Sequence, residues 1–350
     1  MNQERNVAID VLKFFAVLLI TNSHFDHQYV YFKELATGGA IGDALFFFCS
    51  GYTLFMGRLG RFDTWYKRRV RRIAPSVLVL VVIYGYMNPQ LGFPDLMANG
   101  ANWFIPCILI CYVPLYFIRK YAANRLNWVY LFTGILILLW YGIFFEPFRT
   151  WFLTYCKPFD WMLFCTPMDK TWMYQWNYFK WLFFFCFMLM GARMGSLTQF
   201  SDSFISLTGY KGFFKEMTKL MGCVVGFYSI PMLIEKMPEL KFLLILSFFP
   251  LIGICYYFYR WSATEIMRNL YTKKYIGATI SIIGGLCLEI YLVQPFIRTT
   301  EYNHIFPLNI PLLFFAIIIA AYICRCFARI LQQTFTNEDG YNWRGVFKMY

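Results

Sequence analysis

The chain is poor in charge and in histidine for its length of 350 residues. Only 15% of its residues are Asp, Glu, Lys or Arg, and it contains three histidines. A soluble domain has about 25% charged and about 45–50% apolar residues, whereas this chain is 59% hydrophobic and 22% aromatic. These numbers exclude a soluble enzyme, a disordered chain and a small disulfide scaffold. They leave a polytopic helical membrane protein.

Patterns typical of metal sites and of secretion signals are also missing. No CxxC pair occurs among the eleven cysteines, and three histidines are too few for most Cys/His metal sites. We therefore expect no metal, and we interpret the cysteines as small packing residues.

The first apolar run contains Asp10 and Lys13 and is not followed by a small-residue cleavage site. It is predicted to be the first spanning helix and not a cleaved signal.

Ten apolar segments come close to the length of about 20 residues that a membrane span needs. They are residues 7–24, 38–57, 73–88, 102–118, 127–146, 178–195, 218–235, 242–259, 276–296 and 305–324. Several contain Pro or Gly, which membrane bundles tolerate because neighbouring helices satisfy the freed backbone groups. The sequence therefore predicts an all-α bundle of about ten transmembrane helices, forming a single integral-membrane domain over residues 1–350.

The basic residues are distributed unevenly between the two sides of this predicted bundle. With the N-terminus inside, 23 of the 32 Lys and Arg residues fall in inner segments and seven in outer segments. Such an excess on the inner side is the usual signal of orientation. It predicts that both termini are cytoplasmic, and it explains the net charge of +13 without nucleic acid.

The longest outer segment, residues 147–177, is rich in Trp and Tyr. These residues form either an interfacial aromatic belt or a platform that stacks on sugar rings, and the sequence leaves both interpretations open.

The first span carries three ionisable side chains, Asp10, Lys13 and His24. Charges within spans usually face the bundle interior and mark function. Asp10 and Lys13 are three residues apart and can pair. Lys13 and His24 are eleven residues apart, so they share one face of a helix and lie about 16 Å apart along its axis. A structural explanation remains open for each, namely snorkelling for Lys13 and a hydrogen bond to a neighbouring helix for His24.

Five short motifs follow one another along the chain. They are Asp10 with Lys13-x10-His24, Ser50-Gly51-Tyr52 after a Phe run, Arg69-x-x-Arg72 before Pro75, Trp103 in NWFIPCIL, and Glu289, Tyr291 and Gln294 in LEIYLVQPF. In this order they resemble the membrane acyltransferase 3 family, whose members O-acylate glycans and related molecules. The resemblance covers nearly the whole chain. It departs from the family pattern in having Lys13 for the commoner Arg, Ala44 for a common Asp, and Gln294 where many relatives have His.

The resemblance implies a membrane O-acyltransferase, expected to be an O-acetyltransferase, with acyl-CoA (expected to be acetyl-CoA) as donor. His24 would act as general base, because an imidazole titrates at about 6.5, and an acyl-histidine intermediate is the alternative. Lys13 would help hold the donor or stabilise a charged pathway, and Asp10 would tune Lys13. Arg69 and Arg72 would bind its phosphates, although positive-inside anchoring would also explain them.

The remaining motif residues are expected near the acceptor, which would be a glycan or a lipid-linked glycan. Ser50 is a weak candidate for oxyanion stabilisation. Trp103, Glu289, Tyr291 and Gln294 are candidates for substrate binding. Trp103 could stack on a sugar or on the coenzyme, or be a plain interfacial residue. Glu289 could bind the acceptor, orient His24 or have a structural role.

The expected location is a membrane, the inner (cytoplasmic) membrane of a bacterium, with lipids as neighbours and no nucleic-acid partner. No oligomeric state is predicted. A transporter of a glycan, lipid or small molecule is the alternative function, because interior charges on ten spans suit that class as well. A membrane sensor or scaffold would leave the charged first span unexplained.

Overall fold

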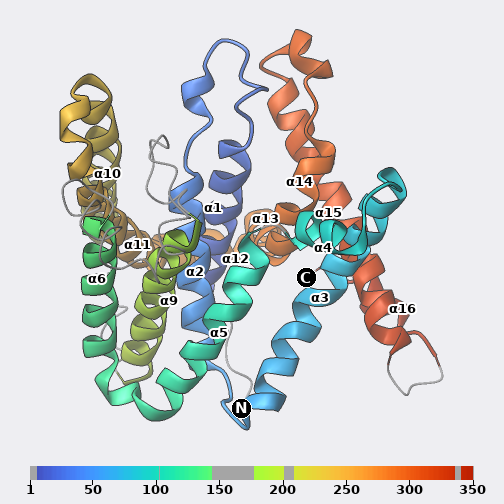
Figure 1. The fold of residues 1–350 in the computed structure, drawn as a ribbon, viewed down its shortest axis with the longest axis horizontal. Helices are drawn as coiled ribbons and strands as arrows, with labels where there is room; N and C mark the ends of the chain where they lie inside the picture. The colour runs from blue at the N-terminus through green and yellow to red at the C-terminus, as the bar shows by residue number, and fades with distance from the viewer. Residues whose placement is uncertain (1–5, 102, 144–176, 201–208, 336–339, 350) are drawn as a thin grey trace, which may run out of the picture. The chain divides into compact units, whose positions relative to one another are not determined.

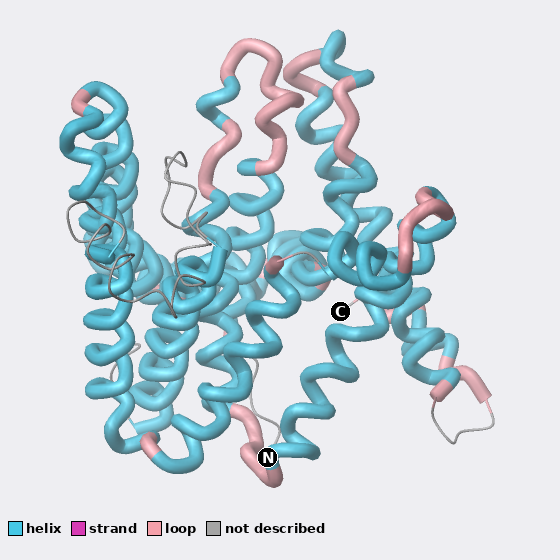
Figure 2. Tube along the Cα trace, viewed as in Figure 1, coloured by secondary structure: helices cyan, strands magenta, loops and turns pink. Residues whose placement is uncertain are grey.

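The computed structural model describes residues 6–101, 103–143, 177–200, 209–335 and 340–349. Within these ranges the chain is helical and contains no strand (Figure 2). This is expected of long apolar segments, because a helix satisfies its own backbone hydrogen bonds in lipid. Seven described helices are long and apolar enough to cross a membrane, or eight if one bent pair counts as a single span. The fold class predicted from the sequence is therefore confirmed.

The helices group into two compact units, which are described separately. Unit 1 comprises residues 1–42, 58–116 and 270–350, and unit 2 comprises residues 43–57 and 117–269. Three helices contribute residues to both units, namely α2 (Gly39–Met56), α5 (Phe104–Tyr121) and α12 (Glu265–Thr272). The prediction of one membrane domain over the whole chain stays a prediction.

Unit 1 is built on the first helix and on the last third of the chain. Besides its parts of the three shared helices, unit 1 contains α1 (Val7–Ser23), η1 (Lys33–Leu35), α3 (Phe62–Met87), α4 (Phe93–Ala101), α13 (Lys274–Gly285), α14 (Cys287–Ile297), η7 (Glu301–Ile305), α15 (Asn309–Thr334) and α16 (Trp343–Val346). Helix α1 packs against α13 and α14, and α15 packs against α14 and α3 (Figure 1). Segments about 270 residues apart in sequence thus lie side by side.

Helices α13 and α14 meet at a sharp break. Their axes differ by 71°, and only Leu286 separates them. The sequence predicted one span over residues 276–296, and the structure corrects this to two half-helices. A break of this kind leaves helix-end carbonyls that need partners inside a membrane.

A glycine lets α13 approach α1 closely. A Cβ at Gly284 would lie 3.1 Å from the carbonyl oxygen of Asp10 and 3.5 Å from the Cβ of Lys13. The break between α13 and α14 therefore lies directly beside the charged turn of the first helix.

Unit 2 contains the remaining helices. They are η2 (Ala123–Arg125), α6 (Leu126–Ile143), α9 (Asn177–Phe200), α10 (Gly209–Lys236), η6 (Pro238–Ser247) and α11 (Phe248–Ser262). Helix α10 packs against α11, and α6 packs against α9. The core is rich in phenylalanine, with the Phe47 and Phe184 rings stacked at 5.4 Å. A buried ion pair joins Glu216 of α10 to Arg260 of α11 at 3.1 Å.

Several helices expose large apolar side chains along one face, as expected of surfaces that face lipid. On α15 the exposed residues recur every three or four positions, at Leu312, Phe315, Ile319, Ile323 and Phe327. The chain is accordingly an integral membrane protein.

Each of the ten predicted spans contains a helix, but the ends differ from the prediction. Helix α3 begins at Phe62, eleven residues before the predicted start, and α15 ends at Thr334, ten residues after the predicted end. Helix α1 has 17 residues, fewer than the roughly 20 of a full span. The aromatic segment 147–177 lies almost wholly outside the described residues.

Candidate active site

A cavity of about 350 Å³ opens in unit 1 beside the α13–α14 break. Its walls come from α3, α13, α14 and α15. The lining residues are Arg68, Arg72, Pro75, Ser76, Ser281, Gly285, Cys287, Leu288, Glu289, Arg325, Ala328, Arg329 and Gln332. Two of them, Arg72 and Glu289, were candidates from the sequence, and the structure brings them into one site.

The cavity carries a strong positive charge. Arg68 and Arg72 are four residues apart on α3, and Arg325 and Arg329 are four residues apart on α15. Residues with this spacing share one face of a helix, so the two packed helices present four guanidinium groups to one space. Among the lining residues Glu289 is the single carboxylate. Clefts lined by one sign of charge concentrate ions of the other sign, so this cavity is suited to a polyanion.

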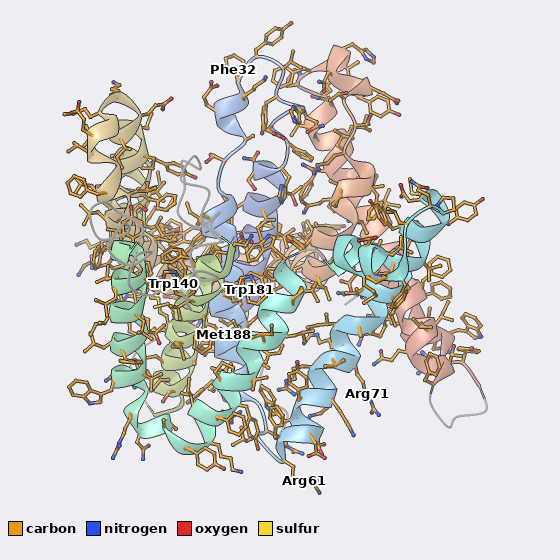
Figure 3. All side chains as sticks on the ribbon, viewed as in Figure 1. Phe32, Arg61, Arg71, Trp140, Trp181 and Met188 are labelled. Atoms are coloured by element: carbon orange, nitrogen blue, oxygen red, sulfur yellow. The ribbon has the colours of Figure 1, made fainter. Side chains whose placement is uncertain are left out.

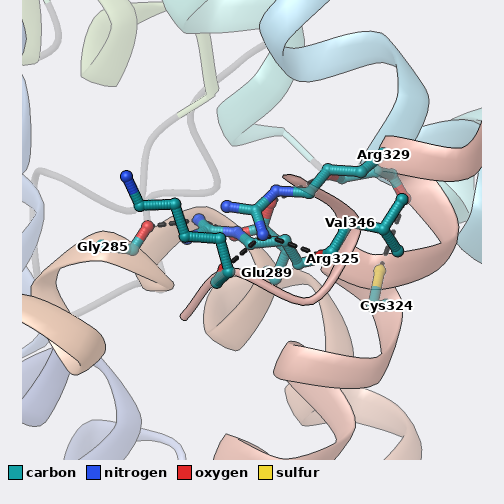
Figure 4. A network of polar contacts seen from close by, with 8 residues as sticks. Gly285, Glu289, Cys324, Arg325, Arg329 and Val346 are labelled. Carbon is teal, nitrogen blue, oxygen red and sulfur yellow. Dashed lines mark hydrogen bonds and ion pairs between the residues drawn. The ribbon is translucent and has the colours of Figure 1, made fainter. Parts of the chain in front are cut away.

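Glu289 ties three helices together at the wall of the cavity (Figure 4). Its carboxylate accepts a hydrogen bond from the Ser76 hydroxyl at 2.9 Å and from the Arg325 guanidinium at 2.6 Å. The same guanidinium group donates to the carbonyl oxygen of Gly285, in the last turn of α13. A cation at the C-terminus of α13 and an anion in the first turn of α14 both complement the helix dipoles. Arg325 and Glu289 therefore stabilise the helix break.

Arg329 binds the C-terminal segment of the chain. Its guanidinium group donates to the carbonyl oxygen of Val346 at 2.9 Å and to that of Lys348. Carbonyl oxygens carry no net charge, so this arginine keeps its full positive charge beside the cavity (Figure 4).

Arg69 and Arg72 have different surroundings, although they belong to one motif. The Arg69 guanidinium lies 4.5 Å from the centroid of the Trp65 ring and donates to the Trp65 carbonyl oxygen. Arg69 does not line the cavity, whereas Arg72 does.

The charged turn of α1 lies next to the cavity. Cys287, which lines the cavity, is within electrostatic range of Lys13, Arg72 and Arg325. Asp10 is buried and accepts a hydrogen bond from the Tyr271 hydroxyl at 3.0 Å. That hydroxyl also shares a hydrogen bond of 2.8 Å with Ser281 of the cavity wall.

His24 lies at the opposite end of α1, as its C-terminal cap. The residue is half-buried, and its carbonyl oxygen accepts a hydrogen bond from Arg298 at 2.5 Å. The Arg298 guanidinium is also within electrostatic range of the His24 imidazole. Gln294, one turn before Arg298, is buried and donates to the hydroxyl of Thr21 at 2.9 Å. The structure thus brings Gln294 to the same end of α1 as His24.

The other candidates lie elsewhere. Tyr291 is buried, and its ring lies 4.9 Å from that of Phe104, which in turn contacts the Trp103 ring edge-to-face. Ser50 belongs to unit 2, unlike the other candidates, and its carbonyl oxygen accepts a hydrogen bond from Thr53.

Arg68, Arg325 and Arg329 were not among the site residues predicted from the sequence. A usable signal was present, because both arginine pairs have a spacing of four residues next to an apolar span. It was missed because these residues lie on the helix extensions beyond the apolar segments.

The fold and the cavity together describe a helical membrane protein with an arginine-rich cavity. A family model described as an acyltransferase domain matches residues 6–329, which is nearly the whole chain. The chain therefore belongs to the acyltransferase 3 family that its motifs resemble, and it is a membrane acyltransferase. No curated protein and no solved structure matches it.

Proposed function

We propose that the protein transfers an acyl group, expected to be acetyl, from cytoplasmic acyl-CoA to a hydroxyl group of a glycan or lipid-linked glycan. The membrane would be the inner membrane of a bacterium. The observation that carries the proposal is the cavity that holds four arginines and one carboxylate in a chain of this family.

The donor has the chemistry that this cavity would recognise. The nucleotide end of acyl-CoA carries several phosphate groups, and planar guanidinium groups bind phosphate oxygens in pairs. Arg68, Arg72, Arg325 and Arg329 would hold these phosphates. All four lie in segments that the distribution of charge assigns to the cytoplasmic side, where acyl-CoA is made.

The acyl group would then react at the other end of α1. Lys13 and His24 are separated by about 16 Å along a helix axis, so the flexible arm of the donor would run along α1. His24 would take the proton of an acceptor hydroxyl while the hydroxyl oxygen attacks the thioester carbonyl carbon. When the carbon–sulfur bond breaks, the imidazolium would return the proton to the leaving thiolate. An acyl-histidine intermediate is the second pathway.

The experiment compares two donors, acetyl-CoA and acetyl-pantetheine, which share the thioester and differ in the nucleotide. Arg72→Gln and Arg329→Gln should each raise the KM for acetyl-CoA by about tenfold or more, because a charged hydrogen bond contributes about 1.5–3 kcal/mol. The KM for acetyl-pantetheine should not change. Arg71→Gln is the matched control, because Arg71 lies on the same helix and outside the cavity (Figure 3).

His24→Ala should abolish transfer of the labelled acetyl group, and His27→Ala should not. Both proteins must reach normal abundance in the membrane for the comparison to hold. Normal transfer by His24→Ala would contradict the proposed mechanism. An equal effect of the arginine changes on both donors would contradict the assignment of the cavity.

A further inference from the structure

The end of unit 1 that holds His24 contains buried polar atoms that have no partner. Within the described residues, no hydrogen bond reaches the side-chain oxygens of Gln28, Gln294 and Asn309 or the Nε of Arg298. The side chains of Gln28, Gln294 and Asn309 are nearly or fully buried. An unpaired buried polar atom costs about 1–3 kcal/mol, so four of them in one place indicate a ligand with complementary groups.

Hydrogen bonds hold these four residues close together. Asn309 donates to the carbonyl oxygen of Gln28 at 3.0 Å, and Gln28 donates to that of Thr299 at 3.2 Å. Thr299 follows Arg298, whose backbone N–H donates to the carbonyl oxygen of Gln294.

The same bonds fix which way two of the amides point. The amide nitrogens of Gln28 and Asn309 each face a backbone carbonyl oxygen, which can only accept. A flipped amide would bring two acceptors together, so in each residue the oxygen is the unpaired atom. The site therefore presents acceptors from its amides and one N–H donor from Arg298.

Aromatic side chains adjoin this polar group. The Phe306 ring lies 6.1 Å from that of Tyr31 and 6.4 Å from that of Phe32. Tyr31 is 77% exposed and Phe32 is 55% exposed, and Figure 3 shows Phe32 at the end of the loop that follows α1. Polar groups at fixed positions beside aromatic rings are typical of ligand sites.

We infer that Gln28, Gln294, Arg298 and Asn309 form a subsite for a polyhydroxylated ring, the sugar of the acceptor, next to His24. Each ring hydroxyl can donate to an amide oxygen, and one can accept from the Arg298 Nε. Phe306 and its neighbours would cover the apolar face of the ring. This inference rests on the proposed function and names the residues that would hold the acceptor.

The test uses two small probes on the full-length protein in lipid nanodiscs. Methyl glucoside carries a full set of ring hydroxyls, and tetrahydropyran-2-methanol has a similar ring and a primary hydroxyl but lacks the others. Methyl glucoside should raise the melting temperature of the wild-type protein, because a ligand that binds the folded state stabilises it. Tetrahydropyran-2-methanol should have a much smaller effect at the same concentration.

Gln28→Met and Gln294→Met keep a similar volume and remove the unpaired acceptor, together with the amide N–H that donates to Thr299 or to Thr21. Each should weaken the binding of methyl glucoside by about three- to tenfold and leave the stabilisation by acetyl-CoA unchanged. Their own melting temperatures should fall moderately, because the lost N–H bond to Thr299 or Thr21 is only partly offset by removal of the unpaired acceptor. A purely structural role would lower the melting temperature and leave the affinity for methyl glucoside unchanged. The control is Gln90→Met, at an exposed glutamine of the α3–α4 loop.

Two results would overturn the subsite. One is equal stabilisation of the wild-type protein by both probes, or by neither. The other is unchanged binding of methyl glucoside in both glutamine variants. Neither result depends on transfer of label from acetyl-CoA, which tests the proposed function separately.

Discussion

Replacing Gly51 by alanine should separate two helices of unit 2. A Cβ at Gly51 would overlap the carbonyl oxygen of Met188, and a Cβ at Gly191 would overlap that of Phe48. Met188 and Gly191 are three residues apart on α9 (Figure 3), as Phe48 and Gly51 are on α2. The two backbones therefore touch at a reciprocal pair of glycines, a contact that small residues permit in membranes.

Two opposing effects, overpacking and helix propensity, determine how much Gly51→Ala changes the free energy of unfolding. Overpacking a close contact costs about 1–3 kcal/mol, and the upper end applies because the obstacle is backbone and not a flexible side chain. Alanine recovers about 1 kcal/mol through its higher helix propensity. We therefore expect Gly51→Ala to lower the free energy of unfolding by about 2 kcal/mol.

Reversible unfolding in mixed detergent micelles would measure this difference. Gly134→Ala is the matched control, because Gly134 lies within α6 and a Cβ there meets nothing within 4 Å. That variant should be as stable as the wild type or slightly more stable.

The double variant Gly51→Ala/Gly191→Ala sharpens the test. Once the first alanine has moved the helices apart, the second should cost little, so the combined loss should be smaller than the sum of the single losses. Strict additivity, or a Gly51→Ala protein as stable as Gly134→Ala, would refute the backbone contact.

Three further predictions concern unit 1. Glu289→Ala should destabilise the protein by about 2 kcal/mol in the same unfolding assay, because it leaves the partly buried Arg325 without its carboxylate, and adding Arg325→Ala should restore part of the loss. Arg69→Gln should raise the KM for acetyl-CoA less than Arg72→Gln does, and equal effects in steady-state assays would contradict the separate surroundings of the two side chains. Raising the salt concentration from about 0.05 to 0.5 M should raise the KM for acetyl-CoA and leave that for acetyl-pantetheine unchanged, because salt screens charge–charge attraction.

The sequence predicted the helical membrane fold, because apolar segments of bilayer length allow few other structures. It predicted about ten spans, whereas seven or eight of the described helices are long and apolar enough to cross a membrane. It did not predict how far the helices extend. Hydropathy marks the part of a helix that lies in lipid, whereas α3 and α15 continue as helices through their charged ends. The arginines of the cavity lie on these continuations. Hydropathy alone therefore could not predict that Arg68 and Arg329 line the same cavity.

The role of each motif residue stays a prediction for a related reason. A motif identifies residues that a family needs, but it does not separate chemistry from packing. Gly51 allows helix contact, and Tyr52 packs its ring 5.7 Å from that of Tyr259. Arg69 binds Trp65 next to it in the same helix. Only the contacts of each side chain distinguish these roles.

Two packed helices connect the arginine cavity with the end of unit 1 that holds His24. Helix α1 carries Lys13 near the cavity and His24 at its cap, and α14 carries Glu289 in its first turn and Arg298 at its cap. Eleven and nine residues correspond to about 16 Å and about 14 Å along the two axes. The two helices thus cover nearly the same distance between their charged groups. Under the proposed function, the flexible arm of the donor would have to span this distance. The sequence of α1 alone could not reveal the second helix, because α14 begins only at the break that Arg325 holds.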